Sequence, residues 1–304
     1  MSSNPRLPMW RSMLFVPVIV DKFVDAAHRR GADAIILDLE DSVPEGQKER
    51  ARGLIQAAAA KVSQGGADVT VRINRPWRQT LRDIEAAVSP LVRALLLPKI
   101  ASADHVRLIA EVVSELEAER GMAVGSTGLV PMIETAEAFF KIHEIARADP
   151  RIVGLNLGAE DFALSLGMLP EAEGLFYPKQ QVVIAARAAG IMPLGFIGTV
   201  ADFKDLDAFR ATIKRSRRLG FMGASVIHPS QIAILNEEFR PTDEEVALAR
   251  RIVAAYEKST AEGIGAIVLD GKMVDVPIVV RAQQTLAHEA AIQAVEGRRR
   301  ASGG

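Results

Sequence analysis

Short apolar runs recur along the chain and alternate with segments of helical composition rich in Ala, Glu and Arg. Each run is about as long as a buried strand. The eight runs cover Ser12–Pro17, Ala34–Glu40, Asp68–Asn74, Arg93–Lys99, Leu129–Glu134, Ile152–Gly158, Ile191–Ile197 and Gly223–Pro229. Strands that alternate with helices are typical of parallel βαβ units, and eight units in a chain of this length predict an α/β fold, the (β/α)8 TIM barrel.

The segment after the eighth run predicts an addition to the barrel. A helical stretch at about 243–262 is followed by a Gly-punctuated turn, "GIGAIVLDGKMVD", and then by a final helix. A segment of this kind can reach outward and close over a site as a lid. We therefore expect a (β/α)8 barrel catalytic domain at residues 1–240, and a C-terminal helical extension with a lid segment at residues 241–304.

Composition and charge exclude several classes of protein. The chain has 304 residues, of which 49% are hydrophobic, and a net charge of −1 at pH 7, so it lacks the basic field typical of proteins that bind nucleic acid or membrane surfaces. The absence of cysteine excludes disulfides, zinc–thiolate sites and thiol nucleophiles. No apolar run reaches the roughly 18 residues of a membrane helix, and the first residues lack a signal-peptide pattern. We expect a cytoplasmic protein with no nucleic acid and no membrane partner.

Polar residues stand at the carboxyl ends of the predicted strands. The second run ends in the stretch "LDLED", which places Asp38, Glu40 and Asp41 next to one another. The other ends carry Arg72 and Asn74, Lys99, Glu134, Glu160 and Asp161, and His228. In a (β/α)8 barrel the loops that follow the strands build the active site at this face. One polar residue at a strand end is ordinary, but the whole set predicts a shared polar site.

Two of these carboxylates, Glu134 and Asp161, form a predicted metal pair. They close adjacent strands, so their side chains are expected to converge at one side of the barrel mouth. Two carboxylates completed by water suit Mg²⁺, whereas zinc is disfavoured because no cysteine or clustered histidine offers softer ligands. The alternative for Glu134 is a carboxylate at the N-terminus of the helix that starts near Thr135, where the helix dipole favours negative charge.

A series of motifs resembles one known family along nearly the whole chain. From Arg11 to Pro277 the sequence contains, in order, "RSMLFVP", "GADAIILDLEDSV", "VRIN", "LPKI", "PMIETAEA", "GAEDFALSLG", "IHPSQI" and "DGKMVDVP". Together they resemble the citrate lyase β-subunit family of the HpcH/HpaI aldolase superfamily, which includes malyl-CoA and citramalyl-CoA lyases. The resemblance implies a (β/α)8 barrel with Mg²⁺ as cofactor and carbon–carbon lyase chemistry on a 3-hydroxyacyl-CoA thioester. It also implies an oxo acid and an acyl-CoA thioester as small-molecule partners, and a homotrimer or hexamer.

The resemblance assigns roles to four residues. The family's metal ligands match Glu134 and Asp161, the pair already expected from the strand ends. Arg72 in "VRIN" matches an arginine whose planar donors suit a substrate carboxylate and whose charge stabilises a developing oxyanion. Asp275 in "MVDVP" matches a general acid/base that a neighbouring subunit supplies in the family. From the sequence alone, Asp275 is an ordinary N-cap of the last helix.

Further residues are expected to support this site. Asp38 and Glu40 would lie beside the metal, where they hydrogen-bond its waters or orient Arg72 and Lys99. Gly158 and Ala159 are assigned to substrate binding, since the missing Cβ of glycine allows close approach of the backbone to the oxo acid.

Two basic residues of the second helix, Lys48 and Arg52, have two interpretations. They match basic positions near the phosphates of the thioester in the family pattern. Alternatively, they form a solvated helix face paired with Glu45 and Glu49. His228 is expected to fix the turn before the helix that starts at Pro229.

Three departures from the family pattern concern substrate binding. Val18 replaces a Gly and the following Arg-Pro pair is missing, Gly195 replaces an Asp, and the Arg expected after Tyr177 is absent, with Lys179 and Gln180 nearby. They indicate retained core chemistry with altered substrate choice. Three hypotheses follow: a Mg²⁺-dependent lyase on malyl-CoA, citramalyl-CoA or a citryl thioester; an aldolase on free 2-oxo acids without CoA; and a non-catalytic barrel that binds an oxo acid.

Overall fold

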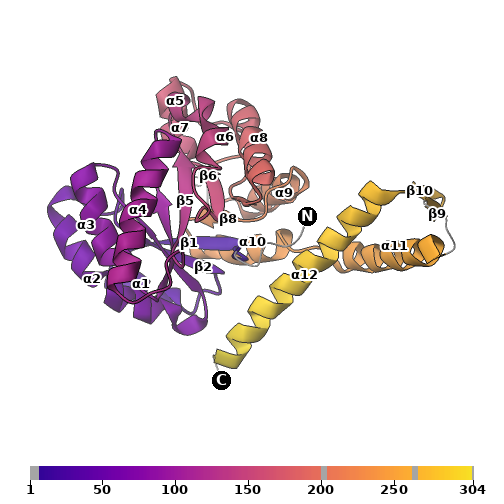
Figure 1. The fold of residues 1–304 in the computed structure, drawn as a ribbon, viewed down its shortest axis with the longest axis horizontal. Helices are drawn as coiled ribbons and strands as arrows, with labels where there is room; N and C mark the ends of the chain where they lie inside the picture. Colours follow the sequence, from indigo (N-terminus) through magenta and orange to yellow (C-terminus); the bar gives the residue numbers. More distant parts are fainter. Residues whose placement is uncertain (1–6, 200–203, 262–265, 303–304) are drawn as a thin grey trace. The chain divides into compact units, whose positions relative to one another are not determined.

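Eight parallel strands lie side by side in the order β7-β6-β5-β4-β3-β2-β1-β8 (Figure 1). Their bounds are β1 Ser12–Pro17, β2 Ala34–Asp38, β3 Asp68–Arg72, β4 Val92–Leu97, β5 Gly128–Ile133, β6 Gly154–Leu157, β7 Met192–Pro193 and β8 Ala224–Val226. A parallel bridge between Leu194 and Gly223 joins the end of β7 to the start of β8 and closes the sheet. The predicted (β/α)8 barrel is confirmed.

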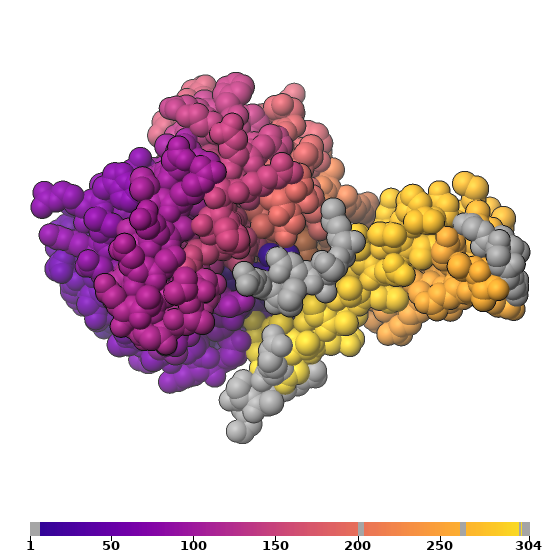
Figure 2. Space-filling model, in the orientation of Figure 1, coloured from indigo at the N-terminus to yellow at the C-terminus, as the bar shows by residue number. Residues whose placement is uncertain are grey.

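The computed structural model describes residues 7–199, 204–261 and 266–302. The chain divides into two compact units, and the boundary in the sequence lies between Phe239 and Arg240. Around the strands of the first unit lie α1 Asp21–Ala27, α2 Lys48–Val62, α3 Trp77–Ala87, α4 Ala103–Glu119, α5 Ala136–Phe140, α6 Ile142–Ile145, α7 Ala159–Leu166, α8 Ala172–Ala189, α9 Leu206–Arg218 and α10 Ile232–Glu238. Figure 2 shows one face of the chain in space-filling form, coloured along the sequence from indigo to yellow. In the described ranges, no helix is both long enough and apolar enough to cross a membrane.

The strands are apolar on both faces, as expected when helices cover a parallel sheet. Alternate residues such as Met13, Ile36 and Leu96 fill the barrel interior together with Trp10. The residues between them pack outward against the helices, where they join the larger of the hydrophobic clusters. This two-sided burial explains why the strands read as continuous apolar runs in the sequence.

The strand register places the candidate site residues next to one another. In the β2–β3 ladder Asp38 lies opposite Arg72, and in the β5–β6 ladder Ile133 lies opposite Leu157. Glu134 and Gly158 therefore follow adjacent strands at the same level. The parallel arrangement brings all of these residues to the carboxyl end of the barrel.

The seventh strand is much shorter than the predicted run Ile191–Ile197. Only Met192 and Pro193 form β7, because Gly195 and Gly198 take φ angles of 130° and 155° that leave the strand conformation. His228 behaves as predicted, since its ring Nδ1 accepts a hydrogen bond from the backbone N–H of Ser230 at the start of the turn Pro229–Gln231.

The second unit contains two helices and a hairpin. Helix α11 (Asp243–Ala261) is followed by antiparallel strands β9 (Ile267–Leu269) and β10 (Lys272–Val274), and then by α12 (Val276–Ser302). The predicted Gly-punctuated turn is, over its described part, a β-hairpin with its own turn at Asp270 and Gly271, while residues 263–265 of it lie outside the described residues. Asp270 and Gly271 have φ angles of 50° and 73°, and an Asp-Gly pair in this conformation is a strong hairpin signal.

A buried carboxylate fastens α4 to the amino-terminal end of β5. Glu117 is fully buried and lies 2.7 Å from the guanidinium of Arg151. It also accepts hydrogen bonds from the backbone N–H groups of Gly125 and Thr127. Burial alone would raise the pKa of Glu117, but these donors lower it to about 2. The ionised form is therefore favoured in the folded state.

We expect Glu117→Gln to lower the free energy of unfolding by roughly 3 kcal/mol at pH 7, because Arg151 loses its buried partner. A carboxyl group whose pKa is lowered by folding stabilises the protein above its unfolded pKa, and this contribution disappears as the pH falls towards about 2. The difference between variant and parent, measured by denaturant unfolding, should thus shrink between pH 5 and pH 3. Glu119→Gln, at an exposed position of the same helix, is the control; a pH-independent difference would contradict the assignment.

Candidate functional site

Arg72 lies among three acids at the end of β3. Its Nε and Nη2 atoms donate to the two carboxylate oxygens of Asp38 at 2.7 and 2.8 Å. Its Nη1 atom lies 2.9 Å from Glu40 and 3.1 Å from Asp41, and the guanidinium covers the ring of Phe15. The predicted pairing of Arg72 with a neighbouring acid is confirmed. Asp38 occupies a two-pronged edge of the guanidinium and so fixes its orientation.

Lys99, at the end of β4, connects acids from three other strand ends. Its backbone N–H donates to Glu134 at 2.6 Å, and its ammonium group lies 2.8 Å from Glu40 and 3.6 Å from Asp161. Its φ angle of 49° is unusual for a residue other than glycine. Burial would lower the pKa of this ammonium group, but the carboxylates, Glu40 first, raise it. Lys99 is therefore a permanent cation in the middle of the site.

The central position of Lys99 is a feature that the sequence did not assign. The residue was expected only to be oriented by its neighbours, and no catalytic or binding role was given to it. The available signal was its place at a strand end in "LPKI". The left-handed backbone, which turns both the N–H and the side chain towards acids, has no signature in the local sequence.

Glu134 is 2% exposed and faces the cluster instead of its own helix. Burial raises its pKa to about 8, and the negative charges of Glu40 and Asp161 act in the same direction. Helix α5 is capped by another residue, Thr135, whose hydroxyl accepts from the backbone N–H of Ala138. The alternative that Glu134 serves that helix terminus is therefore not supported by its contacts.

Gly158 is required by the packing of Glu134. A Cβ atom at Gly158 would lie 2.5 Å from a carboxylate oxygen of Glu134, far inside contact distance. The group that closely approaches this glycine is thus a side chain of the site, and its predicted approach to the oxo acid stays a prediction. Ala159, the next residue, begins α7 and packs against the hydrophobic core.

Glu134 and Asp161 suit a magnesium ion. Asp161 lies in the first turn of α7, partly exposed, and follows the strand adjacent to that of Glu134. Their like charges repel, as the raised pKa of Glu134 shows, and a divalent cation would relieve this repulsion. Within the described ranges no group of three or more His, Cys, Asp or Glu side chains could hold a metal, so water and substrate would supply the remaining ligands. Mg²⁺ commonly keeps such a partly hydrated shell.

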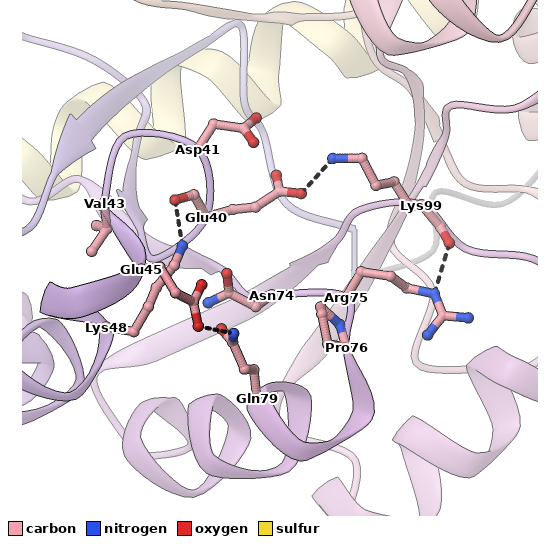
Figure 3. Close-up of a pocket in the computed structure, with 10 residues that line it drawn as sticks. All are labelled: Glu40, Asp41, Val43, Glu45, Lys48, Asn74, Arg75, Pro76, Gln79 and Lys99. Atoms are coloured by element: carbon pink, nitrogen blue, oxygen red, sulfur yellow. Dashed lines mark hydrogen bonds and ion pairs between the residues drawn. The ribbon is translucent and has the colours of Figure 1, made fainter.

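A cavity of about 440 Å³ adjoins the cluster (Figure 3). It is formed by the loops that follow β2, β3 and β4. Glu40 and Lys99 belong both to its wall and to the charged cluster, and Arg75 and Gln79 line another part. The cavity is thus continuous with the charged site and large enough to hold part of a small organic acid.

Lys48 and Arg52 are buried and bound to protein groups. The ammonium group of Lys48 donates to the backbone carbonyls of Leu39 and Glu40 at 2.7 and 2.6 Å (Figure 3). Arg52 donates to Asp83 at 2.6 Å and to Glu49 at 3.0 Å. The predicted pairing of Arg52 with Glu49 is confirmed, but a solvated helix face is wrong, because only 8% and 9% of the two residues are exposed.

These contacts favour a supporting role for both bases. Lys48 holds the backbone that presents Glu40 to Arg72 and Lys99. Arg52 holds Asp83, whose second oxygen accepts from the backbone and side-chain N–H groups of Asn74. Contact of either base with thioester phosphates stays a prediction. Asp83, a buried acid on α3, was not singled out in the sequence.

The positions that depart from the family pattern turn inward. Val18 is buried in the hydrophobic core. Lys179 is also buried, and its ammonium group donates to the carbonyls of Phe196 and Gly198 at 2.6 and 2.7 Å. Burial lowers the pKa of Lys179 to about 7. Lys179 therefore holds the loop after β7 and does not present a charge to the barrel mouth.

Asp275 belongs to the second unit. It precedes α12, and one of its carboxylate oxygens accepts a long hydrogen bond, 3.4 Å, from the backbone N–H of Ile278. The N-cap interpretation of this residue is thus confirmed. The predicted catalytic role of Asp275 stays a prediction.

Comparison with known proteins relates these features to one family. A family model described as HpcH/HpaI aldolase/citrate lyase matches residues 11–229. The chain is 35% identical over 289 residues to the citrate lyase subunit beta of Leuconostoc mesenteroides subsp. cremoris, covering 93% of this chain and 94% of that protein. It is 35% identical over 290 residues to the L-malyl-CoA/beta-methylmalyl-CoA lyase of Rhodobacter capsulatus, covering 88% and 89%.

Two further similarities concern function and fold. The (3S)-malyl-CoA thioesterase of Cereibacter sphaeroides (strain ATCC 17029) is 34% identical over 290 residues, with 94% of this chain and 96% of that protein covered. The structure of CitE from Mycobacterium tuberculosis in complex with magnesium, acetoacetate and coenzyme A superposes with a TM-score of 0.69 at 28% identity. This superposition covers 94% of this chain and 99% of that one.

We expect Glu134→Gln to abolish Mg²⁺ binding without destabilising the fold. The amide keeps the shape and can still accept from the Lys99 N–H, but it cannot ionise to bind the metal, and it replaces a carboxyl group whose charged form is opposed by burial, Glu40 and Asp161. Calorimetric affinity for Mg²⁺ should fall by more than the roughly 10- to 100-fold expected for a residue that only supports a ligand. The free energy of unfolding of the metal-free protein should be unchanged or higher.

The control for this variant is Glu137→Gln, which removes an exposed acid of α5 that is paired with Lys141. It should bind Mg²⁺ as the parent does. Parental affinity in Glu134→Gln would show that the metal, if bound at all, is held elsewhere.

Proposed function

Since the chain belongs to the HpcH/HpaI aldolase/citrate lyase family, we propose that it is a Mg²⁺-dependent carbon–carbon lyase. Its substrate is a 3-hydroxyacyl-CoA thioester such as malyl-CoA, citramalyl-CoA or a citryl thioester, which it cleaves or forms. The observation that carries the proposal is the cluster of Glu134, Asp161, Lys99 and Arg72 at the carboxyl end of the barrel. Relatives that are named lyases are similar in sequence to this chain over most of its length.

The reaction explains why the cluster is rich in both signs of charge. Cleavage breaks the bond between the thioester α-carbon and the hydroxyl-bearing carbon. The hydroxyl passes its proton to a general base, the role assigned below to Asp275, and becomes the carbonyl of a 2-oxo acid, while the bonding electron pair leaves as a thioester enolate. Negative charge thus develops on oxygen and must be stabilised as it forms.

Each component of the cluster has a part in this chemistry. Glu134 and Asp161 would hold Mg²⁺, which when bound supplies a Lewis acid for the oxo acid and the enolate charge. Arg72, oriented by Asp38, contributes fixed positive charge and N–H donors. Glu40 holds Lys99 and Arg72 in place, and Lys48 fixes the backbone of Glu40. Gly158, which packs against Glu134, and Ala159 lie at the N-terminus of α7 and are assigned to substrate binding.

The enolate carbon must finally be protonated. We assign this step, and the removal of the hydroxyl proton, to Asp275, acting from the extension at residues 241–304 onto the barrel of a neighbouring subunit in a homotrimer or hexamer. The hairpin before Asp275 and the N-cap position at α12 present the carboxylate at a bend of the chain. This assignment rests on the match of "MVDVP" to the family pattern.

A second candidate reaction is thioester hydrolysis, because a thioesterase is among the relatives at a similar level of identity. An aldolase on free 2-oxo acids is a third, favoured by the missing Arg-Pro pair after Val18 and by Gly195 in place of an Asp, which remove polar side chains relative to the family pattern. The non-catalytic barrel is disfavoured by the retained acids and Arg72.

One assay separates these functions. Malyl-CoA, citramalyl-CoA, citryl-CoA and the corresponding free acids are incubated with the protein in Mg²⁺ or in EDTA, and products are identified by mass spectrometry. A lyase releases acetyl-CoA and an oxo acid; a thioesterase releases free CoA and the intact hydroxy acid. We expect Mg²⁺-dependent acetyl-CoA from at least one thioester. Free CoA alone, or turnover confined to free acids, would replace the proposal by one of its alternatives.

The role of Asp275 predicts complementation between subunits. Glu134→Gln and Asp275→Asn proteins should each be inactive, and asparagine retains the N-cap at α12. After the two are mixed and subunits have exchanged, some sites combine an intact barrel with an intact Asp275, so activity should return to a fraction of the parental level. Subunit exchange is verified separately with affinity-tagged chains. Persistent inactivity after exchange would place Asp275 in its own chain's site or restrict it to helix capping.

A further inference from the structure

Arg75 is a cation at the cavity wall whose Nη nitrogens have no partner in the described part of the chain. Its Nε atom donates to the backbone carbonyl of Lys99 at 3.2 Å, and the guanidinium extends below that carbonyl (Figure 3). Its Nη atoms make no hydrogen bond or ion pair with any described residue. The backbone of Arg75 is held by Thr80, whose hydroxyl donates to the carbonyls of Asn74 and Arg75. The donor pair is thus positioned but unused.

The acids of the same cavity are all engaged elsewhere. Glu40 is bound by Lys99 and Arg72, and Asp41 is bound by Arg72. Glu45 accepts from the side-chain amide of Gln79 at 2.8 Å. None of them forms an ion pair with Arg75, so its charge is not compensated within the described part of the protein.

The charge of Arg75 acts on a neighbouring histidine. Burial and then the positive charge of Arg75 lower the pKa of His105 to about 4, so this imidazole stays neutral near pH 7. Its Nδ1 atom accepts from the backbone N–H of Ala101, and Trp77 packs on its ring at 5.0 Å. His105 therefore supplies no negative charge to Arg75, and an anionic ligand would complete the site.

The position of the cavity defines which anion fits. Lys99 and Glu40 form a wall shared with the cluster where cleavage is proposed, so the cavity is open to the reacting end of the substrate. Lys48 also lines the cavity, but its ammonium group is bound to the backbone carbonyls of Leu39 and Glu40. The nucleotide phosphates of a CoA thioester are separated from that end by the whole pantetheine arm. A carboxylate also matches the parallel N–H groups of the guanidinium.

We propose that Arg75 binds a second carboxylate of the oxo acid, so that among the proposed thioesters the protein prefers the citryl thioester, whose oxo acid is dicarboxylic, to malyl-CoA and citramalyl-CoA, whose oxo acids carry one carboxylate. This inference rests on the proposed function and names its substrate class. Arg75 is then a specificity-determining residue, separate from the metal pair and from Arg72. The acid's first carboxylate stays with the metal pair, while the second extends into the cavity.

Binding of malate and lactate tests the proposal, since the two acids differ only by the second carboxylate. Both enantiomers of each are titrated by calorimetry into the full-length protein with saturating Mg²⁺. A charge-assisted hydrogen-bonded pair predicts that one enantiomer of malate binds on the order of 10- to 100-fold more tightly than lactate. Arg75→Gln should reduce malate affinity to the lactate level and leave lactate affinity within about twofold, while Arg75→Lys should give an intermediate value.

Arg78→Gln is the matched control, because Arg78 is an exposed arginine three residues further along the chain that does not line the cavity. It should bind both acids as the parent does. Thermal unfolding of all variants verifies that Arg75→Gln is folded. Trp77 fluorescence provides a second readout close to Arg75.

Several results would overturn the proposal. Unchanged malate binding in Arg75→Gln would remove the residue from recognition, and parallel loss of malate and lactate would mean that it acts through Lys99. Loss of affinity for free CoA with malate binding intact would identify a phosphate site instead. Any of these leaves the lyase proposal standing if one of the three thioesters is still cleaved to acetyl-CoA and an oxo acid. A parent protein that binds neither acid with Mg²⁺ would remove the oxo-acid site and the inference together.

Discussion

Three acids gather at the barrel mouth, and the ammonium group and backbone N–H of Lys99 bind them. Glu40, Glu134 and Asp161 arrive there from three different strand ends, and without a cation their mutual repulsion would oppose the fold. Lys99 reaches all three because its backbone adopts a left-handed conformation directly after β4. The burial of Glu134 and the packing of Gly158 against it depend on this arrangement.

Lys99 does not fully compensate the negative charge of the cluster. Glu134 keeps a raised pKa despite the proximity of Lys99, because burial and two like charges outweigh one hydrogen bond and one cation. Such residual destabilisation is typical of a site prepared for a ligand. On the opposite side of Lys99, Arg75 carries a positive charge with no described acid beside it. The site therefore has room for a divalent cation at one end and for an anion at the other.

Positioning is achieved by a second layer of buried contacts. Lys48 grips the carbonyls of Leu39 and Glu40, and Asp38 locks Arg72 from the side. Arg52 and Asp83 fasten Asn74, the residue before Arg75. These side chains come from α2 and α3, so the helical layer that stabilises the barrel also fixes the loops of its mouth. A rigid frame of this kind is what precise placement of charged groups requires.

The sequence by itself determined the barrel and placed Glu134 and Asp161 at the ends of adjacent strands, because strand length and apolar runs are local properties of the chain. The Asp-Gly hairpin was also encoded locally, although the segment was predicted only as a Gly-punctuated turn. Only the tertiary structure decided that Lys48 and Lys179 turn inward, that Lys99 joins three acids, and that Arg75 is left unpaired. These facts depend on side chains up to 62 positions apart, such as Lys99 and Asp161. Barrel closure, burial and register bring them together, and none of these is visible in a short stretch of sequence.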